Sequence, residues 1–146
     1  MGPWTKLLKT AGIVASDEQR LAKYCPDIDR WPESWSVEPR DIASGKQLLE
    51  ANLKPFLLHL LDSGLSRKTL ITHRDNLWIL GGEMIRDFND DPSWRKRSVE
   101  SWLEQAVGED GGPLMHEQIS ERIQQSFDST CRRFYRFRQS TASSAR

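Results

Sequence analysis

The chain has 146 residues, of which 37% are hydrophobic and 29% are charged, a balance typical of a soluble globular protein rather than a disordered one. No apolar run approaches the roughly 18–20 residues that a membrane span needs, and the first residues lack the apolar core of a signal peptide. Cys25 and Cys131 form neither a disulfide framework nor a metal-binding spacing. We therefore expect a cytoplasmic protein that does not associate with membranes.

The formal net charge is zero, which argues against a protein whose whole surface attracts nucleic acid. The charge is unevenly distributed, however. Residues 120–146 contain six arginines against Glu121 and Asp128, a net charge of +4, whereas residues 51–119 are net acidic. A local basic face on a neutral protein is therefore expected near the C-terminus.

Residues 1–44 are predicted to form an irregular arm with short helices. The spacing of Trp4, Leu7 and Ala11 indicates one helix, and Ser16 opens a capping box for a second helix that ends before Pro26. The segment 25–39 has three prolines, carries Trp31 and Trp35, and shows no periodicity, so we expect an extended arm. Its tryptophans either cover the edge of the core or bind a partner protein, since Trp is favoured at interface hot spots.

Helical periodicity begins at Ser44. An apolar stripe runs from Leu49 to about Leu61, and Pro55 predicts that this helix is kinked or begins just before the proline. Gly64 is expected to be a left-handed cap. The next helix spans 64–92, with Ser66 as its N-cap and an apolar face formed by Leu70, Leu77, Leu80, Met84 and Phe88.

Two more helices complete the predicted domain. One runs from Pro92 or Ser98 to Val107, and residues 108–113 form a loop. The other begins between Leu114 and Glu117 and ends near Arg138. Its apolar face is predicted to comprise Ile119, Ile123, Phe127, Cys131 and Phe134. No strand is predicted, so the fold is expected to be all-α, with an arm over 1–44, a four-helix domain over 45–139 and a flexible tail over 140–146.

Catalytic and metal-binding patterns are not evident. His59, His73 and His116 have no second ligand at metal-binding spacing, and Gly81-Gly82 lies within a helical pattern rather than in a phosphate-binding loop. A nucleophile, a base and oxyanion donors cannot be assigned. We therefore expect no enzymatic activity and no cofactor.

Basic residues are the better candidates for function. They cluster at the start of the 64–92 helix and near the end of the last helix, with Arg95–Arg97 between them. Each cluster is either a solvated face or a surface that contacts phosphates. A phosphate-binding surface would be formed by Arg67, Lys68, His73 and Arg74, together with Arg132, Arg133, Arg136 and Arg138.

The segment FLLHLLDSGLSRKTLITHRDNLWILGGEM, from Phe56 to Met84, resembles the opening of the SAM-like core-binding domain of tyrosine recombinases (phage-type integrases). That family shows a Phe-Leu helix followed by Gly-Leu-Ser-x-x-Thr, and Cys131–Phe137 is similar to its Leu-Arg-x-Phe-Tyr-x-Phe phrase. The resemblance covers about residues 45–138. It implies a four-helix bundle of orthogonal helices whose second and fourth helices face duplex DNA. On the second helix the resemblance implies DNA-facing roles for Ser66, Arg67, Lys68, Thr69, His73 and Arg74, and on the fourth for Arg132, Arg133, Arg136 and Arg138.

The catalytic Arg, His-x-x-Arg and Tyr of that family have no counterpart, because neither Tyr24 nor Tyr135 stands in such a context. Our leading hypothesis is thus a non-catalytic DNA-binding domain, a remnant or regulator of a mobile-element recombinase. The alternative is a protein-interaction or regulatory module, such as an antitoxin-like or mobile-element accessory protein, that uses the Trp31 and Trp35 arm and binds no DNA.

Overall fold

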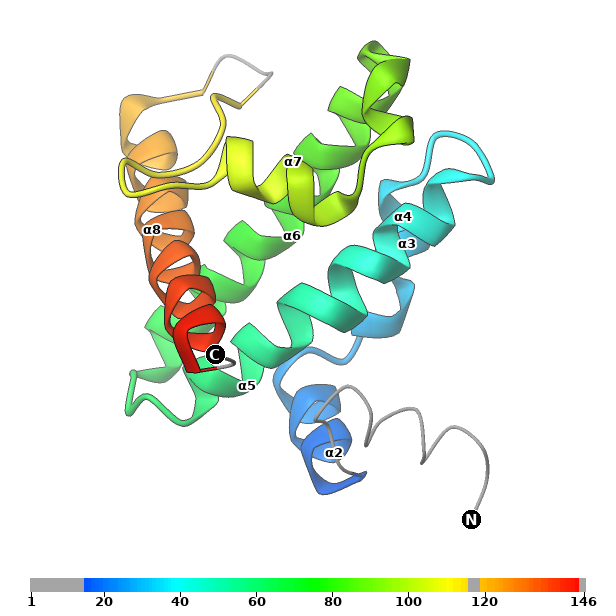
Figure 1. Ribbon diagram of the computed structural model, residues 1–146. Coiled ribbons are helices and arrows are strands. Elements are labelled where there is room, and N and C mark those ends of the chain that lie inside the picture. The colour runs from blue at the N-terminus through cyan, green and yellow to red at the C-terminus, as the bar shows by residue number, and fades with distance from the viewer. Residues whose placement is uncertain (1–14, 116–118, 145–146) are drawn as a thin grey trace. The chain divides into compact units, whose positions relative to one another are not determined.

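The structure is a computed structural model that describes residues 15–115 and 119–144. Within these ranges every regular element is a helix, which confirms the all-α prediction (Figure 1). The chain divides into two compact units, Met1–Leu70 and Ile71–Arg146. The predicted helix over residues 4–11 lies outside the described residues.

The first unit begins with α2 (Ala15–Tyr24), which agrees with the predicted capping-box helix. The segment after it was expected to be extended, but it forms the 3₁₀ turn η1 (Ile28–Arg30) and the short helix α3 (Trp31–Trp35). Proline does not prevent this, because Pro32 lies in the first turn of α3, where its missing N–H is not needed. Periodicity could not reveal so short a helix.

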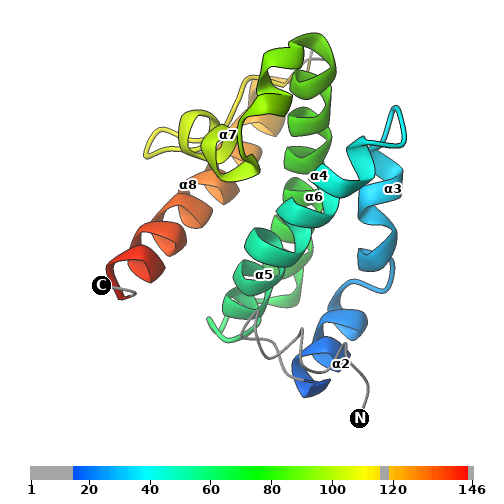
Figure 2. The same cartoon turned by 45° about the vertical axis from the view of Figure 1, so that its right-hand side comes forward.

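Helix α3 packs directly against α4 (Asp41–Leu48), as Figure 2 shows. The contact is close: a Cβ on Gly45 of α4 would lie 3.1 Å from Pro32 Cα and 3.2 Å from Trp35 Cε3. Trp31 and Trp35 are 3% and 6% exposed, with ring centroids 5.7 Å apart. Their large apolar surface therefore forms part of the core of the first unit.

Helix α4 continues through a π-helical turn, η2 (Leu49–Leu53), into α5 (Lys54–Leu61), and Figure 1 shows the three as one rod. The π turn accommodates Pro55, which has no N–H to donate and would clash with the carbonyl of the preceding turn in a regular α-helix. Widening the helix just before it places the proline in the first turn of α5. The predicted apolar stripe is buried at Leu49, Leu53, Phe56, Leu57 and Leu60.

A buried lysine ties three segments of this unit together. Lys54 is 3% exposed, and its Nζ lies 2.9 Å from Glu50 Oε1, 3.4 Å from Glu18 Oε1 and 3.5 Å from Asp29 Oδ1. Burial lowers the pKa of Lys54, but the three carboxylates outweigh it and raise the pKa above its ordinary value. The side chain therefore stays charged.

The long helix α6 (Arg67–Asp90) confirms the predicted element. Gly64 has φ 71°, the left-handed conformation expected of a cap. Ser66 Oγ accepts from Thr69 N at 3.2 Å, so the N-cap is also confirmed. The predicted apolar face is buried at Leu77, Leu80, Met84 and Phe88.

In the second unit, α6 is followed by the 3₁₀ turn η3 (Pro92–Lys96) and by α7 (Val99–Ala106). Ser98 caps α7 by accepting from Ser101 N at 3.0 Å. Trp102 of α7 is 1% exposed, and its Nε1 donates to Asp87 Oδ2 of α6 at 2.9 Å. This bond fixes how α7 lies against α6.

The last helix, α8 (Glu121–Ser144), begins and ends later than predicted. Ser120 is its capping residue, with Oγ accepting from Ile123 N at 3.2 Å. Ile123 is 47% exposed and therefore does not belong to the buried face, which consists of Phe127, Thr130, Cys131 and Phe134. Residues 140–144, expected to be a flexible tail, continue the helix because no Pro or Gly interrupts them.

The loop between α7 and α8 is attached to α8 by polar contacts. Asp128 Oδ1 accepts from Gly112 N at 3.1 Å and from Gln124 Nε2 at 3.0 Å. Gln124 Nε2 also donates to Pro113 O at 3.1 Å, and Gln124 Oε1 accepts from Met115 N at 3.1 Å. Two side chains one turn apart on α8 thus bond main-chain groups of the loop at Gly112, Pro113 and Met115.

Candidate nucleic-acid interface

The predicted site residues 66–69 lie at the start of α6. Ser66, Arg67 and Lys68 are exposed, and Thr69 is half-buried. The two hydroxyls are engaged with each other, since Ser66 Oγ donates to Thr69 Oγ1 at 3.0 Å. Arg67 and Lys68 therefore carry the positive charge at a helix end whose macrodipole is also positive.

His73, predicted to face DNA, does not lie on the surface. It is 6% exposed, and its Nδ1 is 2.7 Å from Thr130 Oγ1 of α8. The prediction was wrong because His73 occupies the buried side of α6, between the apolar positions Leu70 and Leu77. Arg74, the next residue, is half-buried, and its Nε donates to Asp75 Oδ1 at 3.0 Å. Its charge is thus partly compensated by a neighbouring carboxylate.

Around His73 the structure assembles a buried polar cluster that sequence reasoning missed. Asn76 Nδ2 donates to Thr130 Oγ1 at 2.9 Å and to Ser126 O at 3.1 Å. Thr130 is fully buried and Asn76 is 7% exposed. The sequence did contain a signal for this cluster. His73 and Asn76 are spaced i, i+3 on α6, and Ser126 and Thr130 are spaced i, i+4 on α8, each pair within an otherwise apolar face.

The arginines of α8 differ in their surroundings. Arg136 is exposed, whereas Arg132 and Arg133 are half-buried. The guanidinium of Arg138 lies over the Phe134 ring, 5.9 Å from its centroid. Burial lowers the pKa of Arg138, although Glu104 and Glu100 of α7 oppose the shift. Arg138 is therefore associated with the acidic side of α7 and is the least suitable of the four for contacting a phosphate.

One side of α8 combines arginines with uncharged hydrogen-bonding side chains. Its members recur at steps of three or four residues, the spacing of one helix face, with two adjacent pairs, Arg132/Arg133 and Gln139/Ser140, and each member is exposed or half-buried. We call this surface the arginine face; it comprises Arg122, Gln125, Ser129, Arg132, Arg133, Arg136, Gln139 and Ser140. The acidic residues of α8 are Glu121, at its first position, and Asp128, which is bonded to the preceding loop. Five members of this face were not among the predicted site residues or the basic clusters, although the spacing could have identified them.

Trp31 and Trp35, considered as partner-binding residues, are both buried, as described above. This burial agrees with the interpretation that their rings cover the core and removes the basis for a docking arm. The exposed large apolar side chains among the described residues are Val37, Trp78, Leu114 and Ile123.

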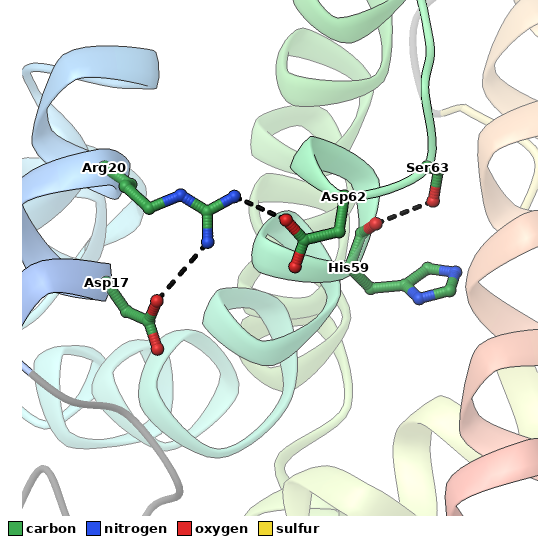
Figure 3. Close-up of polar contacts among 5 residues, drawn as sticks. All are labelled: Asp17, Arg20, His59, Asp62 and Ser63. Atoms are coloured by element: carbon green, nitrogen blue, oxygen red, sulfur yellow. Dashed lines mark hydrogen bonds and ion pairs between the residues drawn. The ribbon is translucent and has the colours of Figure 1, made fainter.

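A second polar group, between α2 and the end of α5, contains the residue types of hydrolytic enzymes (Figure 3). Arg20 bridges Asp17 and Asp62, at 3.4 Å and 2.5 Å. Ser63 Oγ donates at 2.6 Å to the main-chain oxygen of His59 rather than to its ring (Figure 3). These bonds join α2 to α5 and close the end of α5, which is a structural use of the residues.

Residues 15–115 and 119–144 contain no group of three or more His, Cys, Asp or Glu side chains placed to hold a metal ion. None of the helices formed by these residues is long and apolar enough to cross a membrane. Cys25 and Cys131 are both buried and free of disulfides.

Comparison with known proteins found no match to the chain among protein-family models, curated proteins or solved structures. The candidate interface therefore depends on the geometry and charge described above.

Proposed function

We propose that this protein binds duplex DNA without cleaving it, through phosphate contacts made by the arginine face of α8. The observation that carries the proposal is the composition of that face. From Arg122 to Ser140 it presents four arginines and four neutral hydrogen-bonding side chains and no carboxylate. Arginine binds phosphate oxygens in a bidentate manner, and Ser and Gln side chains add hydrogen bonds to the same backbone.

The size of the face suits several consecutive phosphates. At a rise of about 1.5 Å per residue, the 14 steps from Arg122 to Arg136 cover roughly 21 Å of helix. Successive phosphates advance about 3.4 Å along the axis of one strand, so this length passes several of them. Contacts of this kind fix position on a duplex but carry no sequence information. We therefore expect weak, largely sequence-independent binding.

The start of α6 is proposed as a further contact point, through Arg67 and Lys68. The resemblance of Phe56–Met84 to a recombinase core-binding domain supports this role, and the Gly-Leu-Ser phrase that carries the resemblance begins at the left-handed Gly64, between α5 and α6. On this proposal the protein is a non-catalytic relative of such domains that acts in the cytoplasm on a mobile element.

Salt dependence of binding to a fluorescent duplex, followed by anisotropy, tests the proposal. Each phosphate neutralised contributes about −0.9 to the slope of log affinity against log salt, so the four arginines of the face predict a slope of about −3 to −4. Replacing Arg132 and Arg136 with Gln should weaken binding and reduce the slope by roughly 2.

The matched control replaces two exposed arginines elsewhere, Arg30 on η1 and Arg86 on α6, with Gln. It changes the net charge by the same amount but leaves the arginine face intact, so its slope should stay close to that of the wild type. Absence of binding at low salt would reject DNA as the ligand. An equal loss in both double variants would show that net charge, not this face, governs binding.

A further inference from the structure

The polar cluster between α6 and α8 has a defined direction of hydrogen bonding. Asn76 Nδ2 must face Ser126 O, which can only accept, and the same amide group donates to Thr130 Oγ1 at 2.9 Å. The single hydroxyl hydrogen of Thr130 then has two acceptors within reach, His73 Nδ1 at 2.7 Å and Ser126 O at 3.5 Å. The short contact to His73 is the better bond.

With the Thr130 hydroxyl donating to His73, Nδ1 is an acceptor, the ring proton is on Nε2 and the imidazole is neutral. Protonation would turn Nδ1 into a donor. The Thr130 hydroxyl would have to rotate its hydrogen away from His73, toward the distant Ser126 carbonyl. Nδ1 would then donate to Thr130 Oγ1, the hydroxyl hydrogen would keep only the long contact to Ser126 O, and a charge would be placed on a side chain that is 6% exposed.

The charged groups around the cluster do not compensate that charge. Arg133 of α8 is cationic and, together with burial as the larger cause, lowers the pKa of His73. On α6, Arg74 is bonded to Asp75, and on α8, Asp128 is bonded to Gly112 and Gln124. The α7 carboxylates Glu100 and Glu104 act on Arg138.

We propose that the His73–Thr130–Asn76 cluster is an acid-sensitive latch that holds α8 against α6 when His73 is neutral and releases it when His73 is protonated. The latch lies beside Arg133 on the arginine face, but it does not depend on DNA binding. It makes the second unit stable at neutral pH and progressively less stable in mild acid.

The direction in which stability changes with pH follows from where the folded and unfolded chains bind the proton. The unfolded chain binds a proton on His73 near its ordinary value, about 6.5, whereas the folded chain does so only at lower pH. Stability is therefore complete above about pH 6.5 and falls as the pH decreases toward the folded-state value. Each pKa unit between the two states changes the unfolding equilibrium constant tenfold.

Urea unfolding of the full chain between pH 7.5 and 5.0, followed by circular dichroism, tests the latch in the wild type and in His73→Asn. The Asn side-chain oxygen can accept from Thr130 near the position of Nδ1 but cannot be protonated. The wild-type midpoint should fall on acidification, and the His73→Asn midpoint should fall clearly less. His59→Asn, which removes an exposed imidazole, should keep the wild-type dependence.

Parallel pH dependence in the wild type and His73→Asn would overturn the proposal. If His73→Asn does not fold, NMR titration of the wild-type imidazoles decides the matter. A His73 ring that titrates well below His59 supports the latch, and one that titrates at or above His59 overturns it.

Discussion

Gly112 should not tolerate a side chain. A Cβ at this position would lie 2.5 Å from Cys131 Sγ, 3.0 Å from Phe127 Cε2 and 3.2 Å from Cys131 Cβ. Both neighbours are buried on α8, and the main-chain N–H of Gly112 is bonded to Asp128 at 3.1 Å. The loop therefore cannot move away from α8 without losing that hydrogen bond.

The magnitude follows from overpacking. Adding a methyl group to a filled site costs about 1–3 kcal/mol, because side chains or backbone must shift to make room. Gly112→Ala should therefore lower the free energy of unfolding by that amount. For a chain of 146 residues this corresponds to a fall in Tm of roughly 2–12 °C, measured by differential scanning calorimetry or circular dichroism.

Gly108 in the same loop is the matched control, because a Cβ there would meet nothing within 4 Å. Gly108→Ala should leave Tm nearly unchanged. Removing the Sγ atom in Gly112→Ala/Cys131→Ala should relieve part of the clash, so the two substitutions should cost less together than the sum of the single variants. Equal Tm values for Gly112→Ala and Gly108→Ala would refute the packing described here.

Two further variants test the contacts that hold each unit. Lys54→Met should lower the free energy of unfolding by about 2 kcal/mol at pH 7, between the values for exposed and buried pairs, because Glu50 and Glu18 lose their cation. Because the pKa of Lys54 is raised, its contribution to stability is complete below about pH 10.4 and is lost as the pH rises above that value. Urea unfolding at pH 7 and pH 11 should show that the variant lacks this part of the wild-type loss. Trp102→Phe should cost about 1–3 kcal/mol by leaving Asp87 without the indole N–H, and thermal unfolding that matches the wild type would contradict the assigned bond.

Local chemistry explains why several elements were predictable. Ser66, Gly64 and Pro92 delimit α6 through capping, left-handed φ and a missing N–H, all of which act within one turn of the chain. The apolar spacing of Leu77, Leu80 and Met84 likewise reports directly which side of the helix is buried.

The errors arose where a distant segment decided the outcome. Trp35 is buried where α3 packs against Gly45, ten residues later, and no local pattern encodes that contact. His73 is buried because Thr130 of α8 lies opposite it. A basic or polar side chain at a helix start gives no local indication of whether it faces solvent or another helix.

The sequence by itself determined an all-α protein, the long helix between Ser66 and Pro92 and the concentration of arginine near the C-terminus, because helix signals and charge are local properties. Only the tertiary structure decided which charged and polar groups remain accessible. It buried His73 in a hydrogen-bonded cluster, placed Arg138 beside the carboxylates of α7 and left Arg136 exposed on α8. Burial depends on contacts between residues far apart in the chain, and those contacts form only when the helices pack.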